Sequence, residues 1–413
     1  MAKLLIDTAP LKASREFRLL FIGFLISTLG NQLTLVAIPY QIYIATHSTL
    51  QVGLISVAQL LPLIAGSLIG GSYGDHLDRR HILIWASFAL AATSALLVVN
   101  AVLLDTNLVV LYVVAALAAF FGGFSNPSRA AAVPKLVDEE HLTAALAFNQ
   151  VVLQFGGIVG PALAGVLIMA TGVGLVYGLD ALTFLVMALT SWMLRPIPPA
   201  PGATKPGLRS IGEGFTFLRG KKILQSVYLV DLNAMIFGMP RAVFPAMALT
   251  VYKAGPGVLG LLYTAPGAGA FIGVLTTGWL SEVKRRGRAI SIAVAIWGLS
   301  IAAFGLVHSV IAGCILLGVA GWADVISAVL RNTILQTSIP DHFRSRLSGI
   351  QIAVVQGGPK LGDFETGAVA ALSSPVGSVV SGGLLCALGV AALNLYAPQF
   401  WRETPIPLEG DQV

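Results

Sequence analysis

The sequence predicts an all-α integral membrane protein with twelve transmembrane helices in two halves of six. Hydrophobic residues make up 56% of the 413 positions and charged residues only 11%, whereas an average soluble domain has roughly 25% charged residues. Twelve apolar runs are near or above the ~20 residues that cross a bilayer. The longest polar break follows the sixth run, which predicts the division into halves.

The twelve runs can be placed in order along the chain. They occupy residues 17–42, 50–72, 82–104, 108–127, 143–169 and 174–194, and then 223–250, 256–280, 289–308, 310–330, 346–371 and 376–396. The break at 195–222 holds five prolines and six basic residues, the composition of a linker. We therefore expect an N-terminal half at 1–194, a linker at 195–222 and a C-terminal half with a short tail at 223–413.

The distribution of Lys and Arg predicts the orientation. If the helices alternate in direction, 22 of the 25 basic residues fall on one side and Lys253 alone falls on the other, while Arg241 and Lys360 lie inside predicted helices. Basic residues concentrate in the cytoplasmic loops of membrane proteins. The sequence therefore predicts a multi-pass protein of the cytoplasmic (inner) membrane, with both termini and the linker in the cytoplasm.

A short charged loop joins the second and third runs. Basic residues in this loop are explained as topology anchors, but Gly71 and Asp75 are not. Together with Arg79 and Arg80, they resemble the G-x-x-x-D-(R/K)-x-G-(R/K)-(R/K) loop of the major facilitator superfamily, although His76 and Asp78 replace the usual base and glycine.

This loop is predicted to act as a gating latch. If Asp75 meets the start of the eleventh helix, its charge is favourable at that helix N-terminus, and Arg344 and Arg346 are its expected partners. These contacts would exist only while the cytoplasmic side is shut, so they would favour the outward-open state.

The fifth run contains Gly156, Gly160, Pro161 and Gly165. The glycines clear one helix face for close packing, and Pro161 removes a backbone donor so that the helix can bend. Ordinary small-residue packing is the alternative. The stretch resembles the G-x-x-x-G-P-x-x-G pattern of proton-driven exporters of the superfamily, and that resemblance implies export.

Two acids are predicted in one layer near the inner side of the membrane, Asp231 in the seventh helix and Asp324 in the tenth. Charged residues inside a membrane helix cost roughly 2.5–3.5 kcal/mol each, so each needs a reason. Two carboxylates in a cavity of low dielectric can hold one proton between them, which is the minimum apparatus for proton antiport. Alternatively, such an acid bonds to the backbone or pairs with Arg331.

An outer layer is predicted to hold Asp180, Arg241, Lys360, Asp363 and Glu365. We favour a structural charge cluster for Asp180 and Lys360, and Asp363 and Glu365 are further candidates for proton coupling. Uncharged polar groups and one base are the candidates for lining the substrate cavity, namely Asn31, Gln32, Asn233 and Arg241. Pro240 and Pro245 flank Arg241 and free backbone groups, which favours a moving or substrate-lining segment.

Further stretches resemble the enterobactin-exporter-like branch of the superfamily over residues 16–396. They include Asn126-Pro-Ser-Arg129, Asp231-Leu-Asn233 and Gly362-Asp363-Phe-Glu365. The resemblance implies a secondary active transporter that exports an amphipathic small molecule, drug or siderophore-like, by proton antiport through alternating access.

The alternatives are an uncoupled facilitator, a lipid flippase or a non-transporting membrane sensor. No nucleophile–base constellation, metal-ligand spacing or nucleotide motif indicates an enzyme, a metal or a cofactor. The expected partners are the substrate, protons and membrane lipid, without nucleic acid or an obligate protein partner.

Overall fold

The computed structural model describes residues 8–74, 76–102, 106–198, 216, 218–338 and 341–402, without the side chains of residues 281, 341–350, 352 and 353. Within these ranges the chain forms helices joined by turns, and no strand occurs. Two compact units are present. The first comprises Met1–Thr46, Val57–Pro206 and Gly255–Thr264, and the second comprises His47–Ser56, Gly207–Ala254 and Ala265–Val413.

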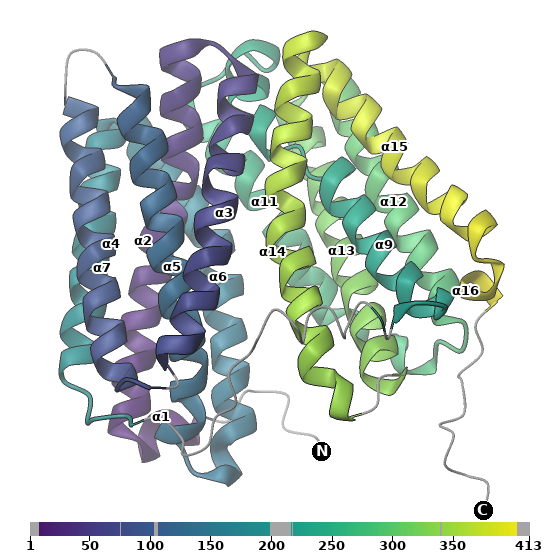
Figure 1. Cartoon of the computed structure of the whole chain (residues 1–413). Helices are drawn as coiled ribbons and strands as arrows, with labels where there is room; N and C mark the ends of the chain where they lie inside the picture. Colours follow the sequence, from purple (N-terminus) through teal and green to yellow (C-terminus); the bar gives the residue numbers. More distant parts are fainter. Residues whose placement is uncertain are drawn as a thin grey trace, which may run out of the picture. The chain divides into compact units, whose positions relative to one another are not determined.

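The first unit is a helical bundle. Its helices are α1 (Ala9–Ala13), α2 (Arg15–Thr46), α4 (Arg79–Val102), α5 (Leu108–Leu136), α6 (Leu142–Thr171) and α7 (Val173–Trp192), with the larger part of α3 (Thr49–Gly74). α2 and α4 both pack on α7, α6 packs on α2 and α5 packs on α4 (Figure 1). Phe17 and Leu83 are fully buried in a hydrophobic cluster near one end of the bundle.

The second unit is a bundle with one interrupted helix. Its helices are α9 (Lys222–Phe237), α12 (Arg286–Leu306), α13 (Val310–Ser338), α14 (Asp341–Leu372), α15 (Pro375–Tyr396) and α16 (Pro398–Arg402), with the larger part of α11 (Pro256–Leu275). α12 packs against α13 and α15, and α14 packs on α9 (Figure 1).

The long helices coincide with the predicted spans. Among the described residues, eleven helices or helical segments are long and apolar enough to cross a membrane, and α14 occupies the place of the remaining predicted span. Large apolar side chains such as Leu61 and Leu395 are exposed, at 74% and 83%. The fold is therefore the predicted all-α membrane architecture.

Two helices continue beyond the predicted ends. α5 runs to Leu136 and α13 to Ser338, where the apolar runs end at 127 and 330. An apolar run ends where polar residues begin, but the helix need not end there. Its backbone hydrogen bonds form in water as they do in lipid. The hydropathy pattern therefore marks the apolar segment rather than the helix end.

The seventh predicted helix is interrupted. α9 ends at Phe237, and the chain continues through a 3₁₀ turn at Arg241–Val243, a short α10 (Phe244–Ala246) and a π-helical turn at Met247–Val251. Pro240 has no backbone N–H to donate, which favours a break in the helix at this point. The Gly238 carbonyl near the break accepts a hydrogen bond from Trp297 Nε1 at 2.8 Å.

Candidate functional site

An ion cluster joins α9 to α13 in the second unit. Arg331 Nη2 lies 2.9 Å from Asp231 Oδ1 and 3.8 Å from Asp324 Oδ1. Arg331 Nη1 also donates to Ser327 Oγ at 2.8 Å. We call Asp231, Asp324, Ser327 and Arg331 the inner ion cluster. Both predicted inner-layer acids thus meet the same guanidinium, the alternative partner that the sequence left open.

The spacing along α13 explains this arrangement. Asp324, Ser327 and Arg331 lie three and four residues apart and therefore share one helix face. The Arg331 and Asp231 side chains are only 7% and 10% exposed, whereas Asp324 is 28% exposed. One guanidinium balances one carboxylate, so the cluster carries a net charge of minus one while both acids are ionised.

A second polar cluster gathers at the interruption after α9. Asp363 Oδ2 accepts from Ser56 Oγ at 2.8 Å, and the Ala242 backbone N–H in the 3₁₀ turn also donates to Asp363. Lys360 and Arg241 are the cations that act on this carboxyl group. We call these five residues the outer cluster, and all of them belong to the second unit.

Glu365 does not share these contacts. Its carboxylate accepts from the neighbouring Thr366 hydroxyl at 3.3 Å, and the charges that act on Asp363 do not include it. The structure therefore brings Asp363, Arg241 and Lys360 together as the sequence predicted and leaves Glu365 beside them on α14.

Asp180 lies in the first unit and has hydroxyl partners where the sequence predicted bases. Its Oδ2 accepts from Thr34 Oγ1 at 2.7 Å and from Ser94 Oγ at 2.8 Å. The residue is 1% exposed, and among the described residues no ion pair involves it. Asp180 therefore links α7 to α2 and α4 through hydrogen bonds.

The residues predicted to line the cavity lie in different settings. Asn31 is exposed on α2, and Gln32 is partly buried with its side chain against Gly157 and Gly160 of α6. Asn233 Nδ2 donates to the Cys386 carbonyl of α15 at 2.9 Å. Arg241 opens the 3₁₀ turn of the interrupted helix. Of these four, only Arg241 belongs to one of the two charged clusters.

The small-residue stripe of α6 meets two neighbours within the first unit. A Cβ on Gly156 would lie 2.7 Å from Thr28 Cγ2, and one on Gly165 would lie 2.8 Å from the Pro256 carbonyl oxygen. Gly160 and Pro161 continue the same packing towards α2 and towards Gly260. The stripe therefore provides the close approach that its spacing predicts, and α6 remains one continuous helix through Pro161.

Only part of the predicted latch falls within the described structure. Gly71 lies inside α3, and a Cβ there would meet nothing within 4 Å. The glycines of α3 that do pack closely are Gly66 and Gly70, against the Phe120 and Phe124 carbonyls of α5. Asp75 and the side chains of Arg344 and Arg346 lie outside the described residues.

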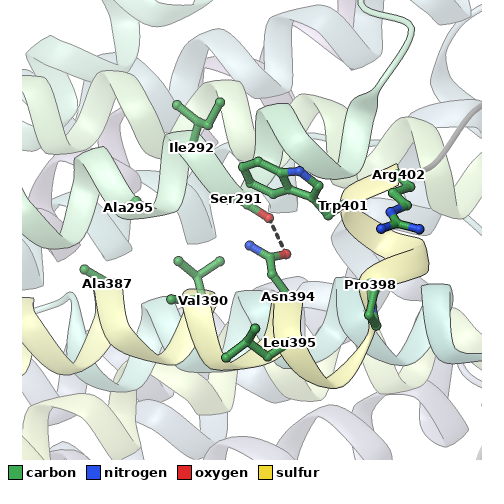
Figure 2. Close-up of a pocket in the computed structure, with 11 residues that line it drawn as sticks. Ser291, Ile292, Ala295, Ala387, Val390, Asn394, Leu395, Pro398, Trp401 and Arg402 are labelled. Carbon is green, nitrogen blue, oxygen red and sulfur yellow. Dashed lines mark hydrogen bonds between the residues drawn. The ribbon is translucent and has the colours of Figure 1, made fainter.

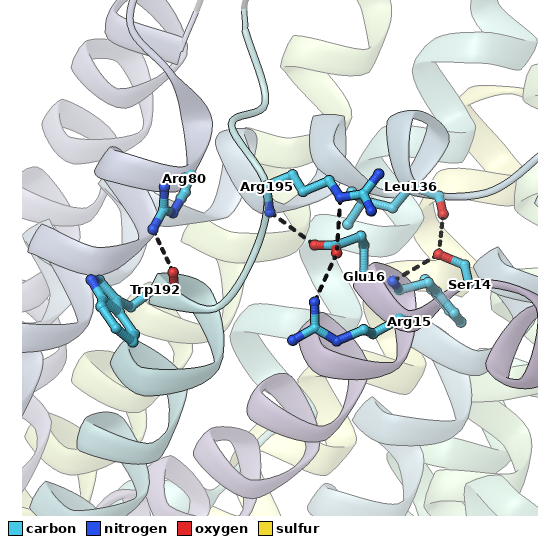
Figure 3. A network of polar contacts seen from close by, with 8 residues as sticks. Ser14, Arg15, Glu16, Arg80, Leu136, Trp192 and Arg195 are labelled. Carbon is cyan, nitrogen blue, oxygen red and sulfur yellow. Dashed lines mark hydrogen bonds and ion pairs between the residues drawn. The ribbon is translucent and has the colours of Figure 1, made fainter.

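The basic pair of the latch binds within the first unit. Arg79 Nη1 donates to the Ala131 carbonyl at 3.4 Å, and Arg80 Nη2 donates to the Trp192 carbonyl (Figure 3). Asp78 Oδ1 accepts from the backbone N–H groups of Arg80 and Ile197, both at 2.9 Å. This loop is thereby bound to α5 and to the segment that follows α7.

Asp78 and Glu16 were not predicted as contact residues. Glu16 forms ion pairs with Arg15 at 3.5 Å and Arg195 at 3.8 Å, and it accepts from the Arg195 backbone N–H (Figure 3). An acid just before a helix is a common N-cap. The position of Asp78 before α4 could therefore have predicted its contact with a backbone N–H. Arg195, the other partner of Glu16, is distant in sequence and left no such signal.

No cluster of three His, Cys, Asp or Glu side chains with the geometry of metal ligands occurs in the described part of the chain. Cys314 and Cys386 are both free thiols. The two charged clusters are held together by ion pairing and hydrogen bonding.

Comparison with known proteins identifies the family. The family described as transmembrane secretion effector matches residues 7–407. The chain is 30% identical to the enterobactin exporter of Citrobacter koseri over 406 residues, 98% of this chain and 97% of that relative. It is also 30% identical to the enterobactin exporter of Escherichia coli over 403 residues, 97% of each chain.

Solved structures share the fold at much lower identity. A variant of the nucleoside transporter NupG aligns with a TM-score of 0.74 at 11% identity, covering 94% of this chain and 100% of that one. A bacterial homologue of the human lysosomal transporter Spinster aligns with a TM-score of 0.72 at 14% identity, covering 95% and 98%. The chain thus belongs to the transmembrane secretion effector family of the major facilitator superfamily and is a multi-pass membrane transporter, not an enzyme.

Proposed function

We propose that this transporter exports an amphipathic small molecule of the siderophore type from the cytoplasm in exchange for protons, by alternating access. Its place would be the cytoplasmic membrane, with both termini on the cytoplasmic side. The substrate class is suggested by the enterobactin exporters that resemble it over nearly the whole chain. The single observation that carries the coupling proposal is the inner ion cluster, in which two acids share Arg331.

Charge balance suggests a division of roles within this cluster. Asp231 is the closer partner of Arg331, and the two form a neutral pair that is almost fully buried. Asp324 lies farther from the shared Arg331, with Arg241 as a second cation that acts on it, and the Oδ1 atoms of both acids are buried without a hydrogen-bond partner. Since an uncompensated charge is costly in a medium of low dielectric, a proton on Asp324 would bring the cluster to neutrality.

The exposure of the two acids supports the same division. The Asp324 side chain is 28% exposed and Asp231 is 10% exposed, so Asp324 has the better access to a proton donor. In this proposal Asp324 carries the proton, while Asp231 holds Arg331 in place. Loss of the proton returns a negative charge beside Arg331, and this change in charge would bias the equilibrium between transport conformations.

The test uses inside-out vesicles that contain the protein, energised to an acid interior, with a pH dye that records proton release. Enterobactin and cationic drugs are added in turn, and direct substrate uptake is measured in parallel. We expect enterobactin-dependent proton release, reduced at least tenfold in Asp324→Asn. Asp180→Asn is the matched control, because Asp180 is a buried acid in a membrane helix that bonds to two hydroxyl groups outside both charged clusters.

Three results would count against parts of the proposal. Full proton release in Asp324→Asn together with its loss in Asp363→Asn would move coupling to the outer cluster. Substrate uptake without proton release would exclude antiport and favour an uncoupled facilitator. Uptake of cationic drugs without uptake of enterobactin would remove the siderophore assignment.

A further inference from the structure

An open groove of about 600 Å³ lies in the second unit between the first turns of α12 and the last turns of α15 (Figure 2). α16 lies across one end of it. Ile292 and Leu395 form apolar walls. Small side chains leave the space between the helices, namely Ala295, Ala387 and Ala391.

The end of the groove beside α16 is polar. Ser291 Oγ donates to Asn394 Oδ1 at 2.9 Å (Figure 2), which leaves the Asn394 amide nitrogen as a donor. Trp401 and Arg402 line the same end. The groove is therefore apolar along its length and rich in hydrogen-bond donors at one end.

Two cation–aromatic pairs lie at the helix ends near this polar end, one of them on Trp401 of the groove lining. The Arg288 guanidinium carbon lies 5.3 Å from the ring centroid of Trp401, and Lys222 Nζ lies 5.6 Å from the ring centroid of Tyr396. None of the described residues that line the groove carries a carboxylate. The charge at this end is therefore complementary to an anion.

The polar end is firmly held. Phe400 is fully buried, and its carbonyl oxygen packs so closely on Gly287 that any side chain there would collide with it. The Ala397 N–H donates to the Leu393 carbonyl at 2.8 Å, at the end of α15. These contacts fix α16, and with it Trp401 and Arg402, at the mouth of a preformed groove.

The helices that form the groove are expected to lie in the membrane. α12 and α15 are both candidate membrane spans, and Leu388 and Leu395 on α15 are 64% and 83% exposed. Trp and Tyr mark the level of the lipid headgroups in membrane proteins, and the charge asymmetry predicts that this end is cytoplasmic. Basic pockets at that level between membrane helices bind anionic lipid headgroups.

We propose that this groove is a binding site for one anionic phospholipid of the cytoplasmic leaflet. An acyl chain lies along Ile292, Ala391 and Leu395, and the volume is within the range of ligand sites. The phosphate is bound by Arg402 and Arg288, with the Asn394 amide as a further donor. The site is separate from both charged clusters and does not depend on the proposed transport function.

The test is native mass spectrometry of the purified protein in a neutral detergent, with the lipids added one at a time. Phosphatidylglycerol, phosphatidylethanolamine and phosphatidylcholine with identical acyl chains are compared. We expect one phosphatidylglycerol to bind in preference to the other two. Since a basic residue near the membrane surface contributes about a factor of five, Arg288→Gln with Arg402→Gln should weaken this binding about twenty-five-fold.

Two further variants separate the groove from general charge effects. Lys284→Gln with Arg285→Gln removes the same charge from the loop before α12, outside the groove lining, and should leave binding of phosphatidylglycerol unchanged. Ala391→Phe fills the groove from an exposed position, keeps every base and should weaken binding as strongly as the loss of the two arginines.

Clear outcomes would overturn the proposal. Equal binding of the three lipids, or equal effects of the two double variants, would indicate ordinary surrounding lipid. Displacement of phosphatidylglycerol by soluble glycerol phosphate at low millimolar concentration would indicate an anion site without a lipid chain. Unchanged binding in Ala391→Phe would place the lipid elsewhere on the protein.

Discussion

At the scale of single residues, Arg331 is the contact on which the inner ion cluster depends. It binds two carboxylates and the Ser327 hydroxyl and is itself almost fully buried. Removing one partner of a buried ion pair is far more costly than replacing the pair, because the remaining charge stays buried. The cluster can therefore be tested by changes in stability as well as by transport.

We expect Arg331→Ala to reduce the free energy of unfolding by about 3–5 kcal/mol. The double variant Arg331→Ala with Asp231→Asn should recover most of this loss, because it removes both members of the closest pair. Thermal unfolding in detergent measures the effect, and Lys284→Ala in an exposed loop is the control. Equal stability of the single and double variants would show that the ion pair does not act as a unit.

Asp180 leads to a different expectation, because its partners are two hydroxyl groups. Asp180→Asn keeps an oxygen acceptor for Thr34 and Ser94, so its cost should stay below about 1 kcal/mol. Asp180→Ala leaves both buried hydroxyls without an acceptor and should cost about 2–5 kcal/mol. The same unfolding measurement compares the two, and normal proton release in Asp180→Asn would show that this acid is structural.

Some contacts of these sites could be predicted from the sequence and others could not. Asp324 and Arg331 share a helix face that can be read from their spacing, and Arg331 was foreseen as a partner. The partners of Asp180 come from α2 and α4, far away in sequence. No local pattern records which hydroxyl a buried acid will meet, because that contact is set by helix packing.

At the scale of elements, the glycine stripe of α6 was visible in the sequence, whereas the interruption after α9 fell inside a span predicted as one helix at 223–250, of which the prolines indicated only that backbone groups are freed. Pro240 removes a backbone donor, but α6 continues through Pro161, so a single proline does not decide whether a helix breaks. The extra turns of α5 and α13 were not visible. The prediction used hydropathy, which does not distinguish a polar helical turn in water from a loop. Helix existence was therefore predicted well, and helix ends less well.

The α6 stripe supplies the test at this scale. Gly165→Ala would place a Cβ 2.8 Å from the Pro256 carbonyl oxygen and 2.9 Å from Gly260 Cα, both on the backbone. We expect a loss of about 1–3 kcal/mol in thermal unfolding, as for other overpacked sites. An equal or higher unfolding temperature would contradict the close packing of α6 with Gly260.

Gly71→Ala is the matched control for that change. It also lies inside a helix, but an added Cβ meets nothing within 4 Å, so the unfolding temperature should stay the same or rise, as Ala favours helix over Gly. If Gly71→Ala also loses transport, that loss belongs to the predicted latch and not to folding.

At the scale of the whole molecule, the class, the helical membrane architecture and the family follow from composition and a few motifs. The orientation rests on the asymmetry of Lys and Arg, and it remains a prediction. The strength of that asymmetry makes the expectation definite, because the basic loops alternate with loops that carry only Lys253.

Cysteine labelling tests the orientation. In a variant whose own thiols are replaced by Cys314→Ala and Cys386→Ala, a single cysteine is introduced as Lys284→Cys or as Lys253→Cys. A membrane-impermeant maleimide should label Lys284→Cys only in inside-out vesicles and Lys253→Cys only in right-side-out vesicles. Labelling of both from one side would contradict the alternating arrangement of the helices.

The segment after α7 has a practical consequence for dividing the protein. The Arg195 N–H donates to Glu16, the Ile197 N–H donates to Asp78, and the Ile197 carbonyl accepts from the Arg79 N–H at 3.1 Å. These residues therefore complete the N-terminal bundle. A two-fragment version of the transporter should be cut after Pro198 rather than after Leu194. A cut after Leu194 would remove these three backbone hydrogen bonds from the N-terminal fragment.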